Sequence, residues 1–245
     1  AAESPEPHCL HAGPTGDGTC GGRCESFCSL ALSTCGDGIL QDGHESCEIG
    51  ETNGDGVSCN PEHCQWGDSR FIFVSSVTFT GDFDNEFNVN TTGLKRADDL
   101  CQILAIGGGL PGSYYAWLSD NNNTEGSDAA ARIGGAQDGA DVVYVMPDGG
   151  AILADGWDQL VSQGPSVAII RTETGVPLDA LPARVWTNTS AQGTSLGEDA
   201  CDNWTTVDGI GLTGSTMMGP GWTAADIAFC TNVDVHVYCI QGTDK

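Results

Sequence analysis

The sequence predicts a mixed α+β domain over residues 69–245, preceded by a small disulfide-rich module over residues 1–68. Two observations separate these parts. Eight of the 12 cysteines lie in the first part, which has no long apolar segment, so disulfides would replace a hydrophobic core there. The second part has one amphipathic helical stretch and several apolar strand-like runs, which together indicate a single core.

The amphipathic helix is expected to organise the second domain. Its apolar residues recur at helical spacing and predict one buried stripe, made of Leu94, Ala97, Cys101, Leu104 and Ala105. Thr91 or Thr92 is the expected N-cap, and the glycines at 107–109 are expected to end the helix. The aromatic run at 115–118 then predicts a short strand.

Other segments carry their own strand and helix signals. The expected elements are a strand at 71–74 that continues through 77–79, a hairpin of 142–146 with 151–153, a short helix capped by Asp155, and strands at 167–170, 185–187 and 233–240. In the last of these, polar and apolar residues alternate, which predicts a strand with two different faces.

The number of cysteines and the net charge limit the cellular compartment and the classes of partner that fit this chain. An even count of 12 cysteines, without a pair of C-x2-C units, favours disulfides, an oxidising compartment and secretion over a zinc protein. We expect the chain to begin where a signal peptide was removed. A net charge of −26 excludes nucleic acid and anionic membranes as partners, and no apolar run is long enough for a transmembrane segment. The acidity favours either solubility alone or binding of divalent cations.

One acidic loop fits a calcium template in part. Five residues occupy template positions 1, 3, 5, 6 and 12, namely Glu51, Asn53, Asp55, Gly56 and Glu62. A glutamate replaces the usual first aspartate, Cys59 interrupts the loop, and flanking helices are missing. The loop is therefore expected either to bind calcium, with the four acidic and amide residues as ligands, or to be a disulfide-pinned loop that binds nothing.

Residues 35–64 resemble a cysteine-rich repeat of myxobacterial secreted proteins. The motifs that carry the resemblance are C-G-D-G from Cys35, G-H-E-S-C ending at Cys47, and G-D-G from Gly54, followed by Cys59 and Cys64. His44 and Glu48 depart from the usual pattern. The resemblance implies a spacer or adhesive module without catalysis.

Residues 71–241 resemble a family of bacterial secreted domains of unassigned function and, more distantly, the endostatin domain of collagens. The landmarks are Cys101 with G-L-P-G at 109–112 and A-W-L-S at 116–119, G-W at 156–157, V-W-T at 185–187, C-D-N-W-T at 201–205, and Cys230 with Y-C-I at 238–240. The resemblance implies a C-type lectin-like fold, with disulfides Cys101–Cys239 and Cys201–Cys230. It also implies that Trp186 and Trp204 pack around the second bridge.

The resemblance implies no particular ligand. The arginine surface through which endostatin binds heparin has no counterpart here, because the chain has only eight lysines and arginines. The histidines with which endostatin binds zinc, and the Glu-Pro-Asn or Gln-Pro-Asp motif of calcium-dependent lectins, are also missing.

Recognition is expected on the polar, glycine-rich loops at 121–137 and 187–221. Asp120, Asn122, Trp222 and Asp226 are the predicted ligand-binding residues. Asn90, Asn122, Asn188 and Asn203 lie in glycosylation sequons, which are expected to be unmodified in a bacterium.

The sequence is best interpreted as a secreted, non-enzymatic binding or adhesion protein that contacts a glycan or protein at a cell surface. One alternative is self-association into an extracellular fibre. The other is a secreted hydrolase, because the G-T-S-L-G motif around Ser195 matches a nucleophile elbow and His236 follows it. That motif lies in a polar loop instead of between a strand and a helix, which argues against catalysis.

Overall fold

The computed structural model describes residues 59–60, 65–66, 69–85, 93–122, 124, 126–138, 142–147, 152–197 and 200–243. Backbone contacts divide the chain into two compact units, residues 1–69 and 70–245. In the first unit, strands β1 (Cys59–Asn60) and β2 (Gln65–Trp66) form a short antiparallel pair. The rest of the expected calcium loop, and the eight cysteines' pairing, lie outside the described residues.

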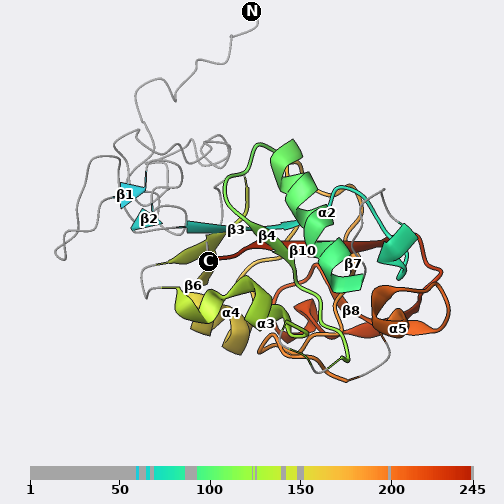
Figure 1. Ribbon diagram of the computed structural model, residues 1–245. Coiled ribbons are helices and arrows are strands. Elements are labelled where there is room, and N and C mark those ends of the chain that lie inside the picture. The colour runs from blue at the N-terminus through green and yellow to red at the C-terminus, as the bar shows by residue number, and fades with distance from the viewer. Residues whose placement is uncertain are drawn as a thin grey trace, which may run out of the picture. The chain divides into compact units, whose positions relative to one another are not determined.

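The second unit is an α+β domain built on a curled sheet (Figure 1). The sheet order is β6-β5-β3-β10-β7-β8-β9, and β4 also pairs with β10. The strands are β3 (Ser69–Val74), β4 (Tyr114–Ala116), β5 (Val143–Val145), β6 (Ile152–Asp155), β7 (Arg184–Trp186), β8 (Ile210–Ser215), β9 (Asp226–Phe229) and β10 (Val235–Gln241). The helices are α2 (Gly93–Gly107), α3 (Ala129–Ile133), α4 (Trp157–Gln163) and α5 (Cys201–Trp204), with short 3-10 turns at η1 (Phe83–Asn85), η2 (Gly135–Gln137) and η3 (Pro220–Trp222).

Strand β10 is the centre of the sheet. It runs antiparallel to β3, with Cys239 opposite Phe73, and parallel to β7, with Val237 opposite Trp186. The first and last strands of the domain therefore lie side by side, as Figure 1 shows. The two faces of this strand enter different cores, and the expected polar face is limited to the half-buried His236, because Tyr238 is as fully buried as Val237. A central strand that is covered on both faces is apolar along most of its length.

Alternate residues of β3 enter two separate cores, one on each face of the sheet. Phe71 and Phe73 belong to a core that also contains the apolar stripe of α2 and the side chains of Trp186 and Trp204. Ile72 and Val74 belong to the other core, under α3 and α4. This burial on both faces explains why residues 71–74 form an uninterrupted apolar run.

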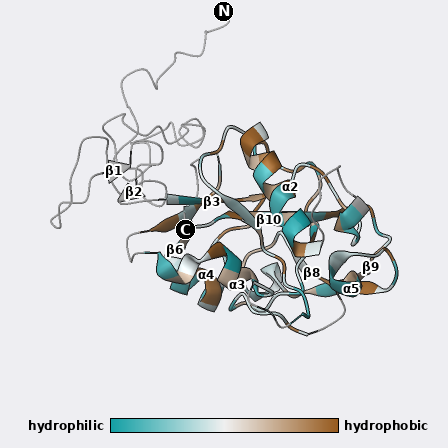
Figure 2. Cartoon of the chain, viewed as in Figure 1, coloured by the Kyte–Doolittle hydropathy of each residue, from teal (hydrophilic) through white to brown (hydrophobic). Residues whose placement is uncertain are grey.

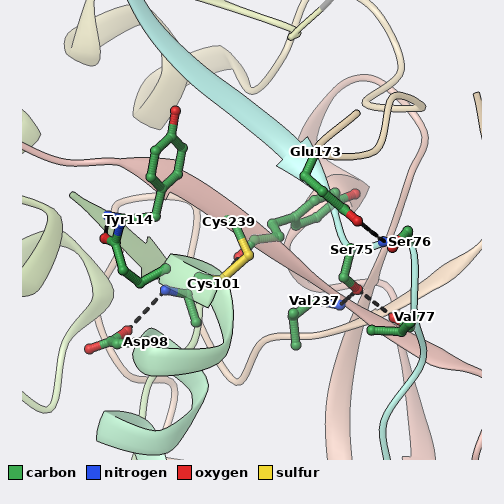
Figure 3. The surroundings of a disulfide bond; sticks show 12 residues. Ser75, Ser76, Val77, Asp98, Cys101, Tyr114, Glu173, Val237 and Cys239 are labelled. Carbon is green, nitrogen blue, oxygen red and sulfur yellow. Dashed lines mark hydrogen bonds between the residues drawn. A yellow bond between two sulfur atoms is a disulfide. The ribbon is translucent and has the colours of Figure 1, made fainter. Parts of the chain in front are cut away.

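Helix α2 is tied to β10 by the bridge Cys101–Cys239, with the two Cα atoms 5.4 Å apart (Figure 3). The end of the helix at Gly107 is confirmed, and so is the buried stripe except for Leu104, which is partly buried against the same core. The expected N-cap threonines lie outside the described residues. Figure 2 shows apolar and polar residues alternating along α2, as expected for a helix with one buried side. Gly108 follows the helix, and a Cβ there would lie 2.2 Å from the Glu173 carbonyl oxygen.

The strand at 71–74 does not continue through 77–79, contrary to the prediction. Ser75 Oγ donates to the Val77 carbonyl at 2.7 Å and accepts from the Val237 N–H at 3.0 Å, while the Ser76 N–H donates to Glu173 (Figure 3). Serine side chains thus take over backbone partners that a strand would use. Phe79 returns to the sheet through a single bridge to Val235.

Three other expectations need correction. Asp155 does not cap α4: it is the last residue of β6, and Gly156, at φ 87°, occupies the N-cap position. No strand forms at 167–170; next to it, Arg171 makes an isolated bridge to Pro177. The aromatic strand ends at Ala116, before Trp117.

Candidate functional site

A polar hollow of about 320 Å³ opens beside the N-terminal end of α2. Its walls come from that helix, from the loop after β4, from α3 and from the segment around α5. The lining residues are Gly93, Leu94, Lys95, Asp98, Asp120, Asn122, Thr124, Gly126, Ser127, Arg132, Asn203 and Thr205. Most of these side chains carry hydrogen-bonding groups, so the hollow suits a polar ligand.

Arg132 of α3 holds three walls of the hollow together. Its guanidinium donates to Asp98 Oδ2 at 3.0 Å, to the Ala116 and Leu118 carbonyls at 2.8 Å each, and to the Gly126 carbonyl at 3.1 Å. Only 11% of the Arg132 side chain is exposed. The planar guanidinium matches this set of acceptors, which fixes the loop after β4 on the helix.

Asp98 is the buried partner of this arginine. Its Oδ1 accepts the Ala116 N–H at 2.9 Å, so the carboxylate joins α2 to β4 as well as to α3. Burial raises the pKa of Asp98, while the charge of Arg132 and the hydrogen bond from Ala116 oppose that rise. Asp98 and Arg132 therefore satisfy each other and are a structural pair beneath the hollow.

The loop wall presents Asp120 and Asn122. Asp120 is buried, and its two oxygens accept the Asn122 N–H at 3.1 Å and the Asn122 side-chain amide at 2.7 Å. Asn122 itself is exposed. The carboxylate thus orients an amide at the mouth of the hollow. The structure brings these two predicted ligand-binding residues together.

The wall that adjoins this loop is one turn of left-handed helix. Four successive residues have positive φ: Cys201 (49°), Asp202 (49°), Asn203 (58°) and Trp204 (69°). Helical hydrogen bonds close the turn, from the Trp204 N–H to the Ala200 carbonyl at 2.7 Å and from the Thr205 N–H to the Cys201 carbonyl at 3.1 Å. This conformation costs about 1–2 kcal/mol for each residue other than glycine. Such local strain clusters at functional sites.

Anchors on both sides hold the strained turn in place. Cys201 is bonded to Cys230, and Trp204 is fully buried, 5.8 Å between ring centres from Trp186. Asn203 Oδ1 accepts the Asn121 N–H at 2.9 Å. Gly93 lies so close that a Cβ there would be 2.7 Å from the Asn203 carbonyl oxygen. Asp202 and Asn203 belong to the residue types that tolerate left-handed backbone best after glycine.

The strain at Asp202 is open to direct measurement, because its side chain is exposed. We expect Asp202→Gly to raise the free energy of unfolding by about 0.5–1 kcal/mol, since glycine accepts positive φ without steric cost. Asp202→Val is expected to lower it by about 1–2 kcal/mol, since a β-branched residue is strongly disfavoured there. Chemical denaturation of the two variants tests this, and equal losses in both would contradict a left-handed turn.

The other two predicted ligand-binding residues lie elsewhere. Trp222 is fully buried in the core, stacked on Trp117 with 4.6 Å between ring centres, so its prediction as a surface residue is wrong. Its backbone also lies close to β8, since a Cβ at Gly214 would be 1.9 Å from the Trp222 carbonyl oxygen. Asp226 is exposed at the start of β9 and faces Arg184 at 3.8 Å.

The asparagines of the glycosylation sequons differ in how far the fold exposes them. Asn188 is fully buried, and its side-chain amide donates to Asn121 Oδ1 at 3.0 Å and to the Ser119 carbonyl at 3.3 Å. Since a glycan attaches through this amide nitrogen, Asn188 is unsuited as an acceptor in the folded domain. Asn122 is exposed and Asn203 half-buried, while Asn90 lies outside the described residues.

Ser195 lacks the surroundings of a nucleophile elbow. A turn, not a strand, leads into it, and it pairs with Thr189 through an isolated bridge. Its hydroxyl donates to Asn121 Oδ1 at 3.1 Å. His236 lies on β10, where its Nδ1 contacts the Ser75 carbonyl at 2.7 Å and burial lowers its pKa. The two side chains have different partners and do not form a nucleophile–base pair.

The described residues hold no evident metal centre and no membrane span. No three histidine, cysteine, aspartate or glutamate side chains there are grouped to hold a metal ion. In the same part of the chain, no helix has both the length and the apolar character to cross a membrane. Comparison of the whole chain with protein-family models and with curated proteins finds no match.

Proposed function

We propose that the chain is a secreted, non-enzymatic binding protein whose C-terminal domain is C-type lectin-like and takes a cell-surface glycan in the polar hollow. The observation that carries this proposal is the lining of the hollow. Asp120 and the Asn122 amide supply acceptor oxygens, although Asp120 also accepts from Asn122, and Lys95 supplies donor hydrogens beside its ion pair with Asp99. Sugar hydroxyls donate and accept together, so a mixed set of this kind suits them.

The proposed fold is supported by the placement of the bridges and the terminal strands. Cys101–Cys239 encloses Cys201–Cys230 in the sequence, and the pairing is the one that the endostatin-like resemblance implies. Strands β3 and β10 close the domain side by side. Secretion is supported by these two disulfides, which persist in oxidising compartments.

Rigidity supports a role in binding. The long bridge fixes α2, Arg132 fixes the loop after β4, and the second bridge fixes the left-handed turn, so each wall is held before a ligand arrives. A site that is already ordered loses less conformational entropy on binding. The strained turn at the rim, with Asn203 on it, is also the kind of backbone outlier found at ligand sites.

A glycan array probed with the full chain, with calcium and then with EDTA, tests the proposal. We expect at least one glycan to be retained, and calorimetry with that glycan should show binding weakened about tenfold by Asn122→Ala, the loss of one or two hydrogen bonds. Dependence on calcium would assign a role to the acidic loop at 51–62, which the variant Glu62→Ala then checks.

Asp226→Ala is the matched control, because it removes an exposed polar side chain outside the hollow. It should leave glycan affinity unchanged. An array without hits would overturn the glycan proposal. A hit that responds to Asp226→Ala and not to Asn122→Ala would move the site away from the hollow.

A further inference from the structure

A second surface, which is apolar, lies on strands β8 and β9. Four apolar side chains form two cross-strand pairs on one face, Ile210 with Phe229 and Leu212 with Ile227. Phe229 is 68% exposed and Ile227 54% exposed. Leu196, 39% exposed, borders the same groove, whose volume is about 420 Å³. We call these five residues the β8–β9 apolar face; Figure 2 marks the two strands.

This clustering of apolar side chains, three exposed and the two on β8 half-buried, is unusual for a surface. Single exposed apolar residues are common, but neighbouring ones on paired strands mark interaction sites. The apolar side chains of β8 and β9 lie on the outer face of these two strands. On the inner face, the buried residues Gly211 and Ala228 fill the space against the core. Gly211 has no room for a side chain, since a Cβ there would lie 2.9 Å from Cys201 Sγ.

Strand β9 is also the end of the sheet. Among the described residues, β8 is the strand that pairs with it, and none pairs with its outer side. The backbone groups on such an edge can add a strand from another chain. The edge and the β8–β9 apolar face therefore offer backbone hydrogen bonds and apolar contacts to the same extended segment.

The negative charge around β9 indicates that the added segment is basic. Exposed aspartates lie at both ends of the strand: Asp226 begins it, while Asp208 and Asp234 lie in the turns at the Phe229 end. Arg184 is the nearby cation, and it already faces Asp226 at 3.8 Å. The whole chain carries a net charge of −26. A basic partner is thus attracted, and a second copy of the chain is repelled.

We infer that the β9 edge docks an extended segment of a partner protein in which apolar side chains alternate with lysine or arginine. The segment adds a strand beside β9. Its apolar side chains cover Ile227 and Phe229, and its basic side chains reach the aspartates at the ends of the strand. This site is independent of the glycan hollow, so either can fail without the other.

The test uses the full chain and a short capped peptide in which valine and lysine alternate. Fluorescence anisotropy should show binding that Phe229→Ser weakens about tenfold, because the large apolar ring no longer packs against the peptide. Ile106→Ser is the matched control, because Ile106 is 67% exposed on α2, and affinity should be unchanged. Exposure of both side chains means that both variants should fold, which far-UV circular dichroism checks.

Three further peptides separate the contributions. An alternating valine–glutamate peptide should not bind, because the aspartates repel it. A serine–lysine peptide tests charge without apolar packing and should bind at least tenfold more weakly. A valine–lysine peptide with a central proline cannot complete the strand pairing and should also lose affinity.

Equal binding of the proline-containing and parent peptides would overturn the added strand. Equal effects of Phe229→Ser and Ile106→Ser would overturn the location of the site. Sedimentation of the chain alone gives the remaining outcome: a dimer abolished by Phe229→Ser would show that a second copy, not a basic segment, covers the β8–β9 apolar face.

Discussion

Replacing Cys101 and Cys239 together with alanine is expected to lower the free energy of unfolding by about 5 kcal/mol, against about 3.5 kcal/mol for Cys201 with Cys230. The two bridges span 138 and 29 residues, and a longer loop constrains the unfolded chain more strongly. Losing the first pair also releases α2 from β10, so we expect that variant to unfold at the lowest denaturant concentration.

The order of the two losses is the informative result. Without its bridge, the left-handed turn at Cys201 can relax, which reduces the cost of the second replacement. Denaturant titrations of both double variants measure which loss of unfolding free energy is larger. The single variants Cys101→Ala and Cys201→Ala, which leave one cysteine of each bridge without a partner, serve as comparisons. A larger loss from the shorter bridge would contradict both the entropic argument and the proposed strain.

Segments whose apolar side chains fill the cores in a regular pattern could be predicted from the sequence. Helix α2 follows from an apolar stripe, and β3 and β5 follow from continuous apolar runs. Strand β8 could not be predicted, because Gly211 and Gly214, one on each face of the strand, leave two buried positions without an apolar side chain and erase the alternation. Those glycines are there because Cys201, Trp186 and the Trp222 carbonyl come within contact distance in the folded state, a fact that no local pattern carries.

Some residues of the candidate site could likewise be predicted from the sequence, and others could not. Asp120 and Asn122 could be predicted, because polar residues between two elements usually lie in a surface loop. Arg132 could not, since its acceptors are carbonyls of a strand and a loop that only the fold brings to it. The sequence marks Asn203 as part of a sequon and of the C-D-N-W-T landmark, but not as a residue of the hollow, because its role in the left-handed turn depends on anchors far away in the chain. Trp222 could not be placed correctly, because a buried and an exposed tryptophan look alike in sequence.

Arg132→Met is expected to lower the free energy of unfolding by about 3–5 kcal/mol, because it leaves Asp98 buried without its charged partner. Arg184→Met is the matched control. Its ion pair with Asp226 is exposed, with 48% and 62% of the two side chains accessible, so its loss should cost at most about 1 kcal/mol. Both substitutions remove one guanidinium and retain most of the aliphatic stem, so the difference reports the surroundings of the charge.

A third variant separates the effect of the unpaired carboxylate from that of the unpaired carbonyls. In Asp98→Asn combined with Arg132→Met, the buried charge is gone, and part of the stability should return. The Ala116, Leu118 and Gly126 carbonyls still lack their donor, so recovery should be incomplete and glycan binding at the hollow should remain weak. Thermal and chemical denaturation of the three variants gives the comparison. A loss below about 1 kcal/mol for Arg132→Met would mean that the arginine does not hold the walls of the hollow together.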